Sequence, residues 1–480
     1  MMKGTGMHSS ILPKWISYAA LAQILCSGQA CYDRGLIIKG DAGTADSPDH
    51  DVLEVAPDQN IDPGDPDAVP PGETWIMTLG GTVFDNLDSA AESADGGLVM
   101  VGETGSFEGC GLWIVKADRE GRIVWQRIMV NDNSCQGDVI VPSREGGFVV
   151  AGSISPELYE WDMFLLRISE DGTPLWPNAV KLPQDYTTAL VELADGSLLA
   201  GGFLKDADEE NGYLTLTGLD ASGNVLWQRG IRAVYGEAFM RTAALPDGSV
   251  LVAVKTSRDQ ETILTVLDAA GNVLWSKGSE LSIQSVATLP DGGIAALAYW
   301  SDGMLGNHGI LVAKLDGEGN SLWQRTWSSL PMIEPRGVTL GDDSSIVLLI
   351  DEDTGPDFST IGLMGIDEAG GLLWHRTINS GMADYGWSLL KMADGDLAVV
   401  GKSGTLFFNL YHDAFIARLD AEGRVRGNCG ILEDQETVLE NEDVPFHAAE
   451  IMLEESTAAA EALPVAFVDT PAVPEVFCPE

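Results

Sequence analysis

The 480-residue sequence has few bases, histidines or cysteines: 27 Lys and Arg stand against 73 Asp and Glu, with only six histidines and six cysteines. The resulting net charge of −46 argues against nucleic acid or an anionic membrane surface as partner, because both would repel the chain. The histidines show no metal-ligand spacing, and no Gly-x-Ser-x-Gly elbow is present. The sequence therefore predicts no catalytic residue and no cofactor.

Long hydrophobic runs are also missing. The longest, residues 15–26, is about a dozen residues, which is too short to span a bilayer but typical of a signal-peptide core. We predict a signal peptide over residues 1–30 and an exported protein. Gly28 and Ala30 favour cleavage before Cys31, the position of the lipidated cysteine in bacterial lipoproteins. The alternative is simple secretion with one free thiol.

Seven tryptophans, in contrast, recur every 48 to 51 residues along the chain, at Trp75, Trp125, Trp176, Trp227, Trp275, Trp323 and Trp374. A repeat of roughly 40 to 50 residues built from strand-length segments is typical of a β-propeller blade. The sequence therefore predicts an all-β protein, a seven-bladed propeller of four-stranded blades over residues 73–430.

Each unit has the same internal order, seen clearly in residues 189–229. Four Val-, Leu- and Ala-rich runs are separated by a tight Asp195-Gly196 turn, a longer variable loop, and an Asp220-x-x-Gly223 turn. The tryptophan follows on the fourth run, where its indole would fill the widening space between adjacent blades. The two short turns fall on one face of the ring and the variable loops on the other.

The first and last units complement each other. The last unit has Gly427 where its tryptophan should be, whereas Trp75 precedes the first Asp-Gly turn with no complete blade before it. We infer that the strand around residues 73–79 completes the seventh blade, so that N-terminal and C-terminal strands pair and leave no open edge.

Four cysteines remain if Cys31 is lipidated, an even number that suits disulfides in an oxidising compartment. Cys110 and Cys135 lie in loops on one face and can be bridged, and Cys429 with Cys478 would tie the tail to the last blade. Residues 31–72 are rich in Asp, Pro and Gly and predict an extended acidic tether. For the acidic tail, residues 431–480, we favour extended segments packed against the ring.

The variable loops are the expected binding rim, because sequence variation with aromatic residues marks binding surfaces. The candidates are Phe107, Tyr159, Trp161, Phe203, Trp300, Phe358, Phe407, Tyr411 and His412. Two equivalent loops are acidic and make calcium the candidate ion, although neither has the spacing of a dedicated calcium loop. Their carboxylates include Asp206, Asp208, Asp351 and Asp353.

The turn and tryptophan segments LDASGNVLW, LDAAGNVLW and LDGEGNSLW resemble the tryptophan-docking repeat of quinoprotein-like propellers. The resemblance covers residues 75–427 and concerns the blade type rather than an activity. Here the Asp-to-Gly step is one residue shorter, and the adjacent cysteine pair of quinone-dependent dehydrogenases is absent. That family includes non-enzymatic bacterial envelope lipoproteins, and the resemblance implies such a protein.

Together these features predict a non-catalytic, monomeric propeller lipoprotein of the cell envelope or cell exterior. We expect its loop face to bind a protein, peptide or glycan, and membrane contact only through a lipid anchor. The alternative is a hydrolase or lyase acting on polysaccharide. A quinone-cofactor protein is a third hypothesis, which a purified protein without chromophore would exclude.

Overall fold

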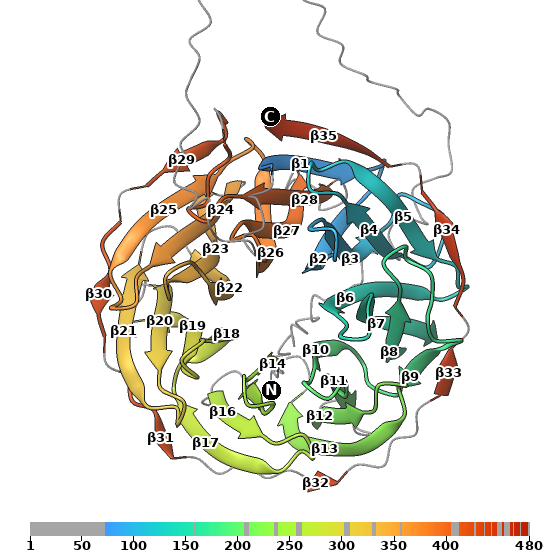
Figure 1. Ribbon diagram of the computed structural model, residues 1–480, viewed down its shortest axis with the longest axis horizontal. Helices are drawn as coiled ribbons and strands as arrows, with labels where there is room; N and C mark the ends of the chain where they lie inside the picture. The colour runs from blue at the N-terminus through green and yellow to red at the C-terminus, as the bar shows by residue number, and fades with distance from the viewer. Residues whose placement is uncertain are drawn as a thin grey trace, which may run out of the picture. The chain divides into compact units, whose positions relative to one another are not determined.

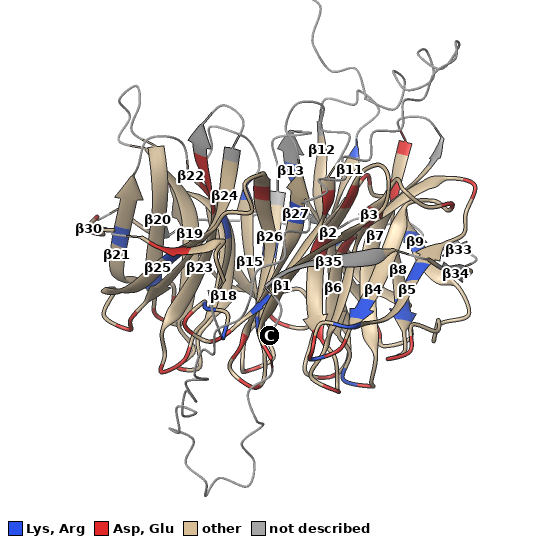
Figure 2. Ribbon diagram, turned by 90° about the horizontal axis from the view of Figure 1, so that it is seen from above, with Lys and Arg blue, Asp and Glu red and all other residues tan. Residues whose placement is uncertain are grey.

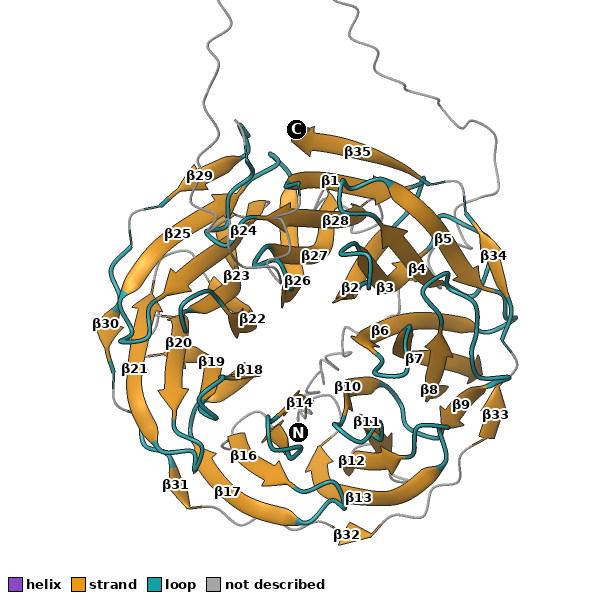
Figure 3. Cartoon of the chain, viewed as in Figure 1, coloured by secondary structure: helices purple, strands orange, loops and turns teal. Residues whose placement is uncertain are grey.

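The computed structural model describes residues 73–480, except 158–159, 206–210, 235–238, 256–261, 302–307, 329–332, 356–357, 405–411, 427–428, 436, 443, 449–453, 456–460, 464, 471 and 479–480. Within these residues the chain forms strands and loops and no helix (Figure 3). Seven antiparallel sheets surround a common centre (Figure 1), which confirms the predicted seven-bladed propeller.

Every blade has an innermost strand at the centre of the ring, followed by a second strand. The innermost strands are β2 (Asp85–Glu92), β6 (Ser134–Pro142), β10 (Thr187–Glu192), β14 (Phe239–Ala244), β18 (Ser282–Thr288), β22 (Ile333–Leu340) and β26 (Ala383–Lys391). The second strands are β3 (Leu98–Thr104), β7 (Phe148–Glu157), β11 (Leu198–Lys205), β15 (Val250–Lys255), β19 (Ile294–Ser301), β23 (Ile346–Gly355) and β27 (Leu397–Gly404).

A third strand and an outer strand complete the blade. The third strands are β4 (Leu112–Ala117), β8 (Glu160–Ile168), β12 (Asn211–Leu219), β16 (Thr262–Leu267), β20 (His308–Leu315), β24 (Phe358–Ile366) and β28 (His412–Leu419). The outer strands of blades 1 to 6 are β5 (Ile123–Met129), β9 (Ala179–Leu182), β13 (Val225–Val234), β17 (Val273–Ser279), β21 (Ser321–Ser328) and β25 (Leu372–Ile378).

Blade 7 takes its outer strand from the other end of the propeller. Strand β1 (Trp75–Gly80) pairs antiparallel with β28, with Trp75 opposite Arg418. The predicted closure of the ring by N-terminal and C-terminal strands is therefore confirmed. At the same junction Arg119 of blade 1 pairs with Asp394 of blade 7 at 3.0 Å.

The repeated tryptophan of each blade packs on the turn glycine of the next blade. A Cβ atom added at Gly121 would lie 2.8 Å from the Trp75 ring, and one at Gly319 would lie 2.8 Å from Trp275. All seven glycines of this set have φ between 73° and 85°, a backbone conformation that favours glycine. The set comprises Gly121, Gly172, Gly223, Gly271, Gly319, Gly370 and Gly423.

The indole and its neighbours also bind the next blade through polar contacts. Trp75 Nε1 donates to the carbonyl of Arg119 at 3.0 Å, and Trp323 Nε1 donates to the carbonyl of Glu368 at 2.9 Å. Two residues after Trp323, the guanidinium of Arg325 lies over the indole at 5.5 Å and donates to the Gly370 carbonyl at 2.9 Å. Tryptophan, arginine and glycine thus join adjacent blades at the outer radius.

Figure 2 shows acidic residues in the turns along the lower edge of the ring.

The tail adds a fifth strand to every blade and encircles the ring (Figure 1). It visits blades 6, 5, 4, 3, 2, 1 and then 7, in the direction opposite to the blades themselves, and pairs antiparallel at each one. We call this segment the belt. Its strands are β29 (Leu432–Asp434), β30 (Glu440–Asn441), β31 (His447–Ala448), β32 (Glu454–Glu455), β33 (Glu461–Leu463), β34 (Phe467–Asp469) and β35 (Val473–Cys478).

In blades 1 and 5 the glutamine after the repeated tryptophan holds the belt. Gln324 Nε2 donates to the Val444 carbonyl at 2.8 Å, and Val444 N donates to Gln324 Oε1 at 2.9 Å. Gln126 makes a similar pair of contacts: it donates to the Ala472 carbonyl at 2.9 Å and accepts from Thr470 Oγ1 at 3.1 Å. A primary amide can satisfy a backbone N–H and C=O together, so it extends the sheet ladder sideways.

In blade 6 a histidine takes the place of this glutamine. His375 is buried, and its Nδ1 lies 2.7 Å from Thr437 Oγ1 of the belt while its Nε2 lies 2.8 Å from Glu352 Oε1. The belt also places apolar side chains against the clusters between blades, including Leu439, Phe446, Val465 and Ala472. Side-chain burial and backbone pairing therefore act together along the belt.

A disulfide joins Cys110 and Cys135, whose Cα atoms are 5.0 Å apart, between blades 1 and 2. Cys429 is disulfide-bonded as well. Its predicted partner Cys478 ends β35, where its backbone is opposite Ile76, but its side chain lies outside the described residues. The pairing of Cys429 with Cys478 stays a prediction.

Alanine at the glycine beneath a tryptophan should cost more stability than alanine at an open turn glycine. Gly319→Ala meets the Trp275 ring, whereas Gly292→Ala in the same blade has nothing within 4 Å, although both glycines have positive φ. We expect both variants to lose about 1 to 2 kcal/mol from backbone strain. Gly319→Ala should lose about 1 to 3 kcal/mol more through overpacking. Equal urea unfolding midpoints for the two variants would contradict the docking role.

Removing the belt should destabilise the ring and promote association. A chain ending at Gly430 would expose the outer edges of all seven blades, and unpaired edges template pairing with other chains. We expect a lower thermal midpoint and concentration-dependent oligomers in light scattering. Full-length Cys429→Ser is the control, since the truncation also removes Cys478. A truncated chain that matches this control and stays monomeric would show that the belt is dispensable.

Candidate functional site

The innermost strands of six blades carry a β-bulge at the same register. In each, one residue has no partner on the second strand; blade 4 instead pairs from Phe239 to Ala244 without a shift. Bulges of this kind redirect a side chain out of the regular pleat. The six bulge residues are Asp88, Asp138, Thr188, Gln284, Arg336 and Trp387.

These residues share a position but not a chemistry. All six are half-buried, while the residue before each one is buried. They lie on the strands nearest the centre of the ring (Figure 1) and supply carboxylates, a hydroxyl, an amide, a guanidinium and an indole. With Glu103, Asp351 and Lys402 on the adjoining second strands, they form what we call the central site. The short turns and the docked tryptophans, in contrast, repeat nearly the same residues around the ring.

Carboxylates gather on the side formed by blades 1 and 2. Burial and the charge of Asp138 raise the pKa of Glu103 to about 7. Burial raises the pKa of Asp138 to about 6, although Ser153 and Gln136 donate to it at 2.6 and 2.8 Å. Burial and the charges of Asp138 and Glu103 also raise the pKa of Asp88 well above its usual value. Near neutral pH this side can hold or release a proton.

Cations and aromatic rings occupy the side formed by blades 6 and 7. The Lys402 ammonium lies 5.3 Å from the Tyr385 ring centre and 5.1 Å from that of Trp387. Burial lowers the pKa of Lys402, while the charge of Asp88 opposes this shift. Arg336 Nε donates to Asp351 Oδ2 at 2.6 Å, and Gly386 N donates to Asp351 Oδ1 at 2.9 Å.

The Asp351 carboxyl is therefore held by both blade 6 and blade 7. Burial raises its pKa to about 6, and the neighbouring guanidinium of Arg336 opposes this rise. The central site as a whole combines carboxyls on the side of blades 1 and 2 with an Arg–Asp ion pair, a lysine and aromatic rings on the side of blades 6 and 7. Such a site suits a polar ligand that offers both donors and acceptors and an apolar ring face.

The predicted rim residues are dispersed in the structure. Phe107 packs on Trp113 with ring centres 6.2 Å apart, Phe203 is fully buried against Tyr186, and Trp161 is half-buried. Trp300 lines a cavity beside the belt. Tyr159, Phe407 and Tyr411 lie outside the described residues, as does the side chain of Phe358.

His412 is the rim candidate that the fold brings to the central site. It lies 6.0 Å from the Phe84 ring, and burial together with the charge of Lys402 lowers its pKa to about 4. The imidazole is therefore neutral at physiological pH, where it can accept or donate a hydrogen bond but carries no charge.

The structure describes two of the four predicted calcium carboxylates, Asp351 and Asp353. Asp351 is buried in its ion pair with Arg336, Asp353 ends the regular pairing of β23 with β24, and Asp206 and Asp208 lie outside the described residues, as does Cys31. Among the residues that the structure describes, no group of three or more His, Cys, Asp or Glu is arranged to hold a metal ion. The same residues include no helix long and apolar enough to cross a membrane.

Most residues of the central site were not among the sequence candidates, although the repeat carries a signal for them. In blades 1, 2, 3, 5, 6 and 7 the bulge residue precedes the acid of the tight turn by seven residues, if Asp343 is taken as that acid in blade 6. Side chains at this position vary, whereas the residues directly before and after it are apolar or small. Lys402 lies in the regular strand β27, which places its ammonium beside the rings of Tyr385 and Trp387.

No protein-family model matches the chain, and no curated protein resembles it significantly. Solved structures share the fold at low identity. Sqt1 from Chaetomium thermophilum is 12% identical, with 74% of this chain and 86% of that chain covered and a TM-score of 0.42. Polysaccharide lyase Uly1 is 9% identical, with coverage of 70% and 90% and a TM-score of 0.46. The NanB sialidase of Streptococcus pneumoniae is 9% identical, with coverage of 73% and 69% and a TM-score of 0.38. These similarities identify no family and carry no activity over.

The raised pKa of Glu103 predicts a loss of stability as the pH rises. Below the ordinary pKa of 4.5 the Glu103 carboxyl is protonated in both the folded and the unfolded chain, so it does not change the free energy of unfolding. Between 4.5 and about 7 the unfolded chain ionises while the folded chain stays protonated, so folding loses up to about 3 kcal/mol. In urea unfolding from pH 4 to 8, Glu103→Gln should flatten this decline. Glu108→Gln, at an exposed acid of the same blade, should not.

Proposed function

We propose that this protein is an exported binding module whose central site takes a glycan. The observation that carries the proposal is the variable bulge position: six blades place half-buried side chains of five chemical types at one register near the centre of the ring. Structural repetition alone would favour one residue type at equivalent positions. Selection for a particular ligand accounts for a ring of unlike groups.

The chemistry of the site favours a sugar over an ion or an apolar ligand. Trp387 and Tyr385 supply aromatic rings beside a cation, and Asp88, Asp138 and Arg336 supply hydrogen-bonding groups from several directions. Hydroxyl-rich rings with apolar faces use both kinds of contact. The variable loops, on the face opposite the short turns, remain the proposed surface for a larger glycan or for a protein or peptide that carries one.

We propose further that the protein is anchored in the bacterial cell envelope through a lipid on Cys31. The disulfide between Cys110 and Cys135 supports an oxidising compartment, and residues 15–26 support a signal peptide. Docking of every repeated tryptophan on a turn glycine supports the resemblance to quinoprotein-like envelope propellers. Calcium at the acidic loops stays a prediction, and we propose no other cofactor.

Replacing Trp387 should abolish most glycan affinity. A glycan array on the exported, purified protein would identify a ligand, and calorimetry would then compare variants. We expect Trp387→Ala to weaken binding about fivefold to tenfold, since loss of an aromatic stacking contact costs about 1 to 1.5 kcal/mol. Trp161→Ala, at a half-buried tryptophan outside the central site, should bind normally. If Trp161→Ala loses affinity and Trp387→Ala does not, the ligand binds elsewhere.

A hydrolase or lyase acting on polysaccharide is the second candidate function. It is favoured by the coupled carboxyls of Glu103 and Asp138, whose pKa values of about 7 and 6 suit proton transfer at neutral pH. Release of reducing ends or unsaturated products from a polysaccharide panel would support this function. Glu103→Gln should then lower kcat by about a hundredfold or more. Binding without turnover is the result expected for the binding module.

A further inference from the structure

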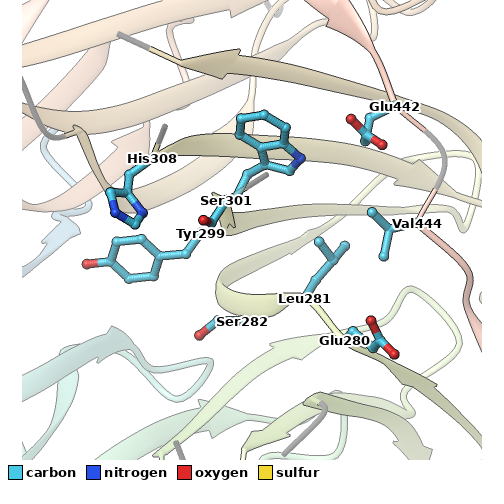
Figure 4. Close-up of a pocket in the computed structure, with 9 residues that line it drawn as sticks. Glu280, Leu281, Ser282, Tyr299, Ser301, His308, Glu442 and Val444 are labelled. Atoms are coloured by element: carbon cyan, nitrogen blue, oxygen red, sulfur yellow. The ribbon is translucent and has the colours of Figure 1, made fainter. Parts of the chain in front are cut away.

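A second cavity lies where the belt passes the connection from blade 4 to blade 5 (Figure 4). The cavity has a volume of about 560 Å³ and opens between the ends of β18, β19 and β20. Its lining residues are Glu280, Leu281, Ser282, Tyr299, Trp300, Ser301, His308, Glu442 and Val444. None of these residues was assigned to the central site, but the two adjoin, since Gln284 Nε2 of that site donates to Ser282 Oγ at 3.0 Å.

The belt forms one wall of this cavity through Glu442 and Val444. That wall is fixed by Gln324, which exchanges two hydrogen bonds with Val444 and accepts from Glu442 N through its own carbonyl at 3.4 Å. Val444 and Trp300 also pack against the same hydrophobic cluster between blades 4 and 5. The cavity is therefore built from two parts of the chain and held in shape by buried contacts.

The lining is acidic, aromatic and apolar, and its two carboxylates lie on one side of the cavity. Figure 4 shows Glu280 and Glu442 on one side with Leu281 and Val444 beside them, and Tyr299 with His308 on the other. Trp300 adds an indole. Among the lining residues that the structure describes, none is Lys or Arg. Bases nevertheless act on two lining residues: Lys255 donates to Ser282 Oγ at 2.7 Å, and the charge of Arg336 acts on Tyr299.

We propose that this cavity binds an organic cation, an ammonium or guanidinium group on an apolar body. Two carboxylates favour a positive charge, an indole attracts a cation to its face, and Leu281 and Val444 can cover the methylene or methyl groups. The volume falls within the range of small-ligand pockets. The excess of 46 negative charges on the chain would also draw cations toward it. This proposal does not rest on the glycan function.

The cationic group can belong to a free small molecule or to a Lys or Arg side chain of a basic peptide. Calorimetry on the full exported chain would use choline as the small cation and 3,3-dimethyl-1-butanol as its neutral isostere. We expect choline to bind at least about tenfold more tightly than the isostere, and binding to weaken with salt. A Lys- and Arg-rich peptide that displaces choline with higher affinity would identify a protein side chain as the source. Failure to displace choline would identify the small molecule.

Matched variants test the assignment to this cavity. Glu442→Gln and Trp300→Leu should each weaken choline binding about fivefold to tenfold. Glu440→Gln, an exposed belt acid outside the lining, removes the same charge and should have little effect. Equal affinity for choline and its isostere, equal effects of Glu442→Gln and Glu440→Gln, or no detectable choline binding would each overturn the proposal. A glycan bound here instead of the cation would overturn it too.

Discussion

The contact between a tryptophan and a glycine one blade away is the constraint on which this propeller depends. A blade cannot close the ring unless its outer strand reaches the next blade, and the indole spans that distance at the widest radius. The turn glycine is required on the other side, because a side chain there would occupy the space of the ring system, as the position of Trp275 above Gly319 shows. Seven such contacts leave no blade without a neighbour.

The same outer strand serves a second structure through alternate residues. Trp323 and Arg325 point to the next blade, whereas Gln324 between them binds the belt. The alternation of side chains along a strand makes this division natural. The tripeptide Trp323-Gln324-Arg325 therefore contacts both the next blade and the belt. The belt in turn forms one wall of the cavity at blade 5.

Much of the ring could be predicted from sequence because its signals are local and repeated. The Asp-Gly turns, the tryptophan period and the displaced strand at Trp75 each follow from a few neighbouring residues. The central site could not be predicted in the same way. Asp88 reads as an ordinary strand residue, and only the shift in pairing between β2 and β3 reveals it as a bulge. The belt has strands as short as two residues, too short for any hydrophobic period to show.

The belt has a consequence for how this gene can change. Repeat proteins gain and lose units readily when a repeat is duplicated or deleted, because each unit contacts only its neighbours. Here the tail carries one strand for each blade, in reversed order, and β35 finishes on the strand that begins the propeller. An eighth blade would leave one edge bare, and a sixfold ring would leave one tail strand without a place. A change in the number of blades therefore requires a matching change in the length of the tail.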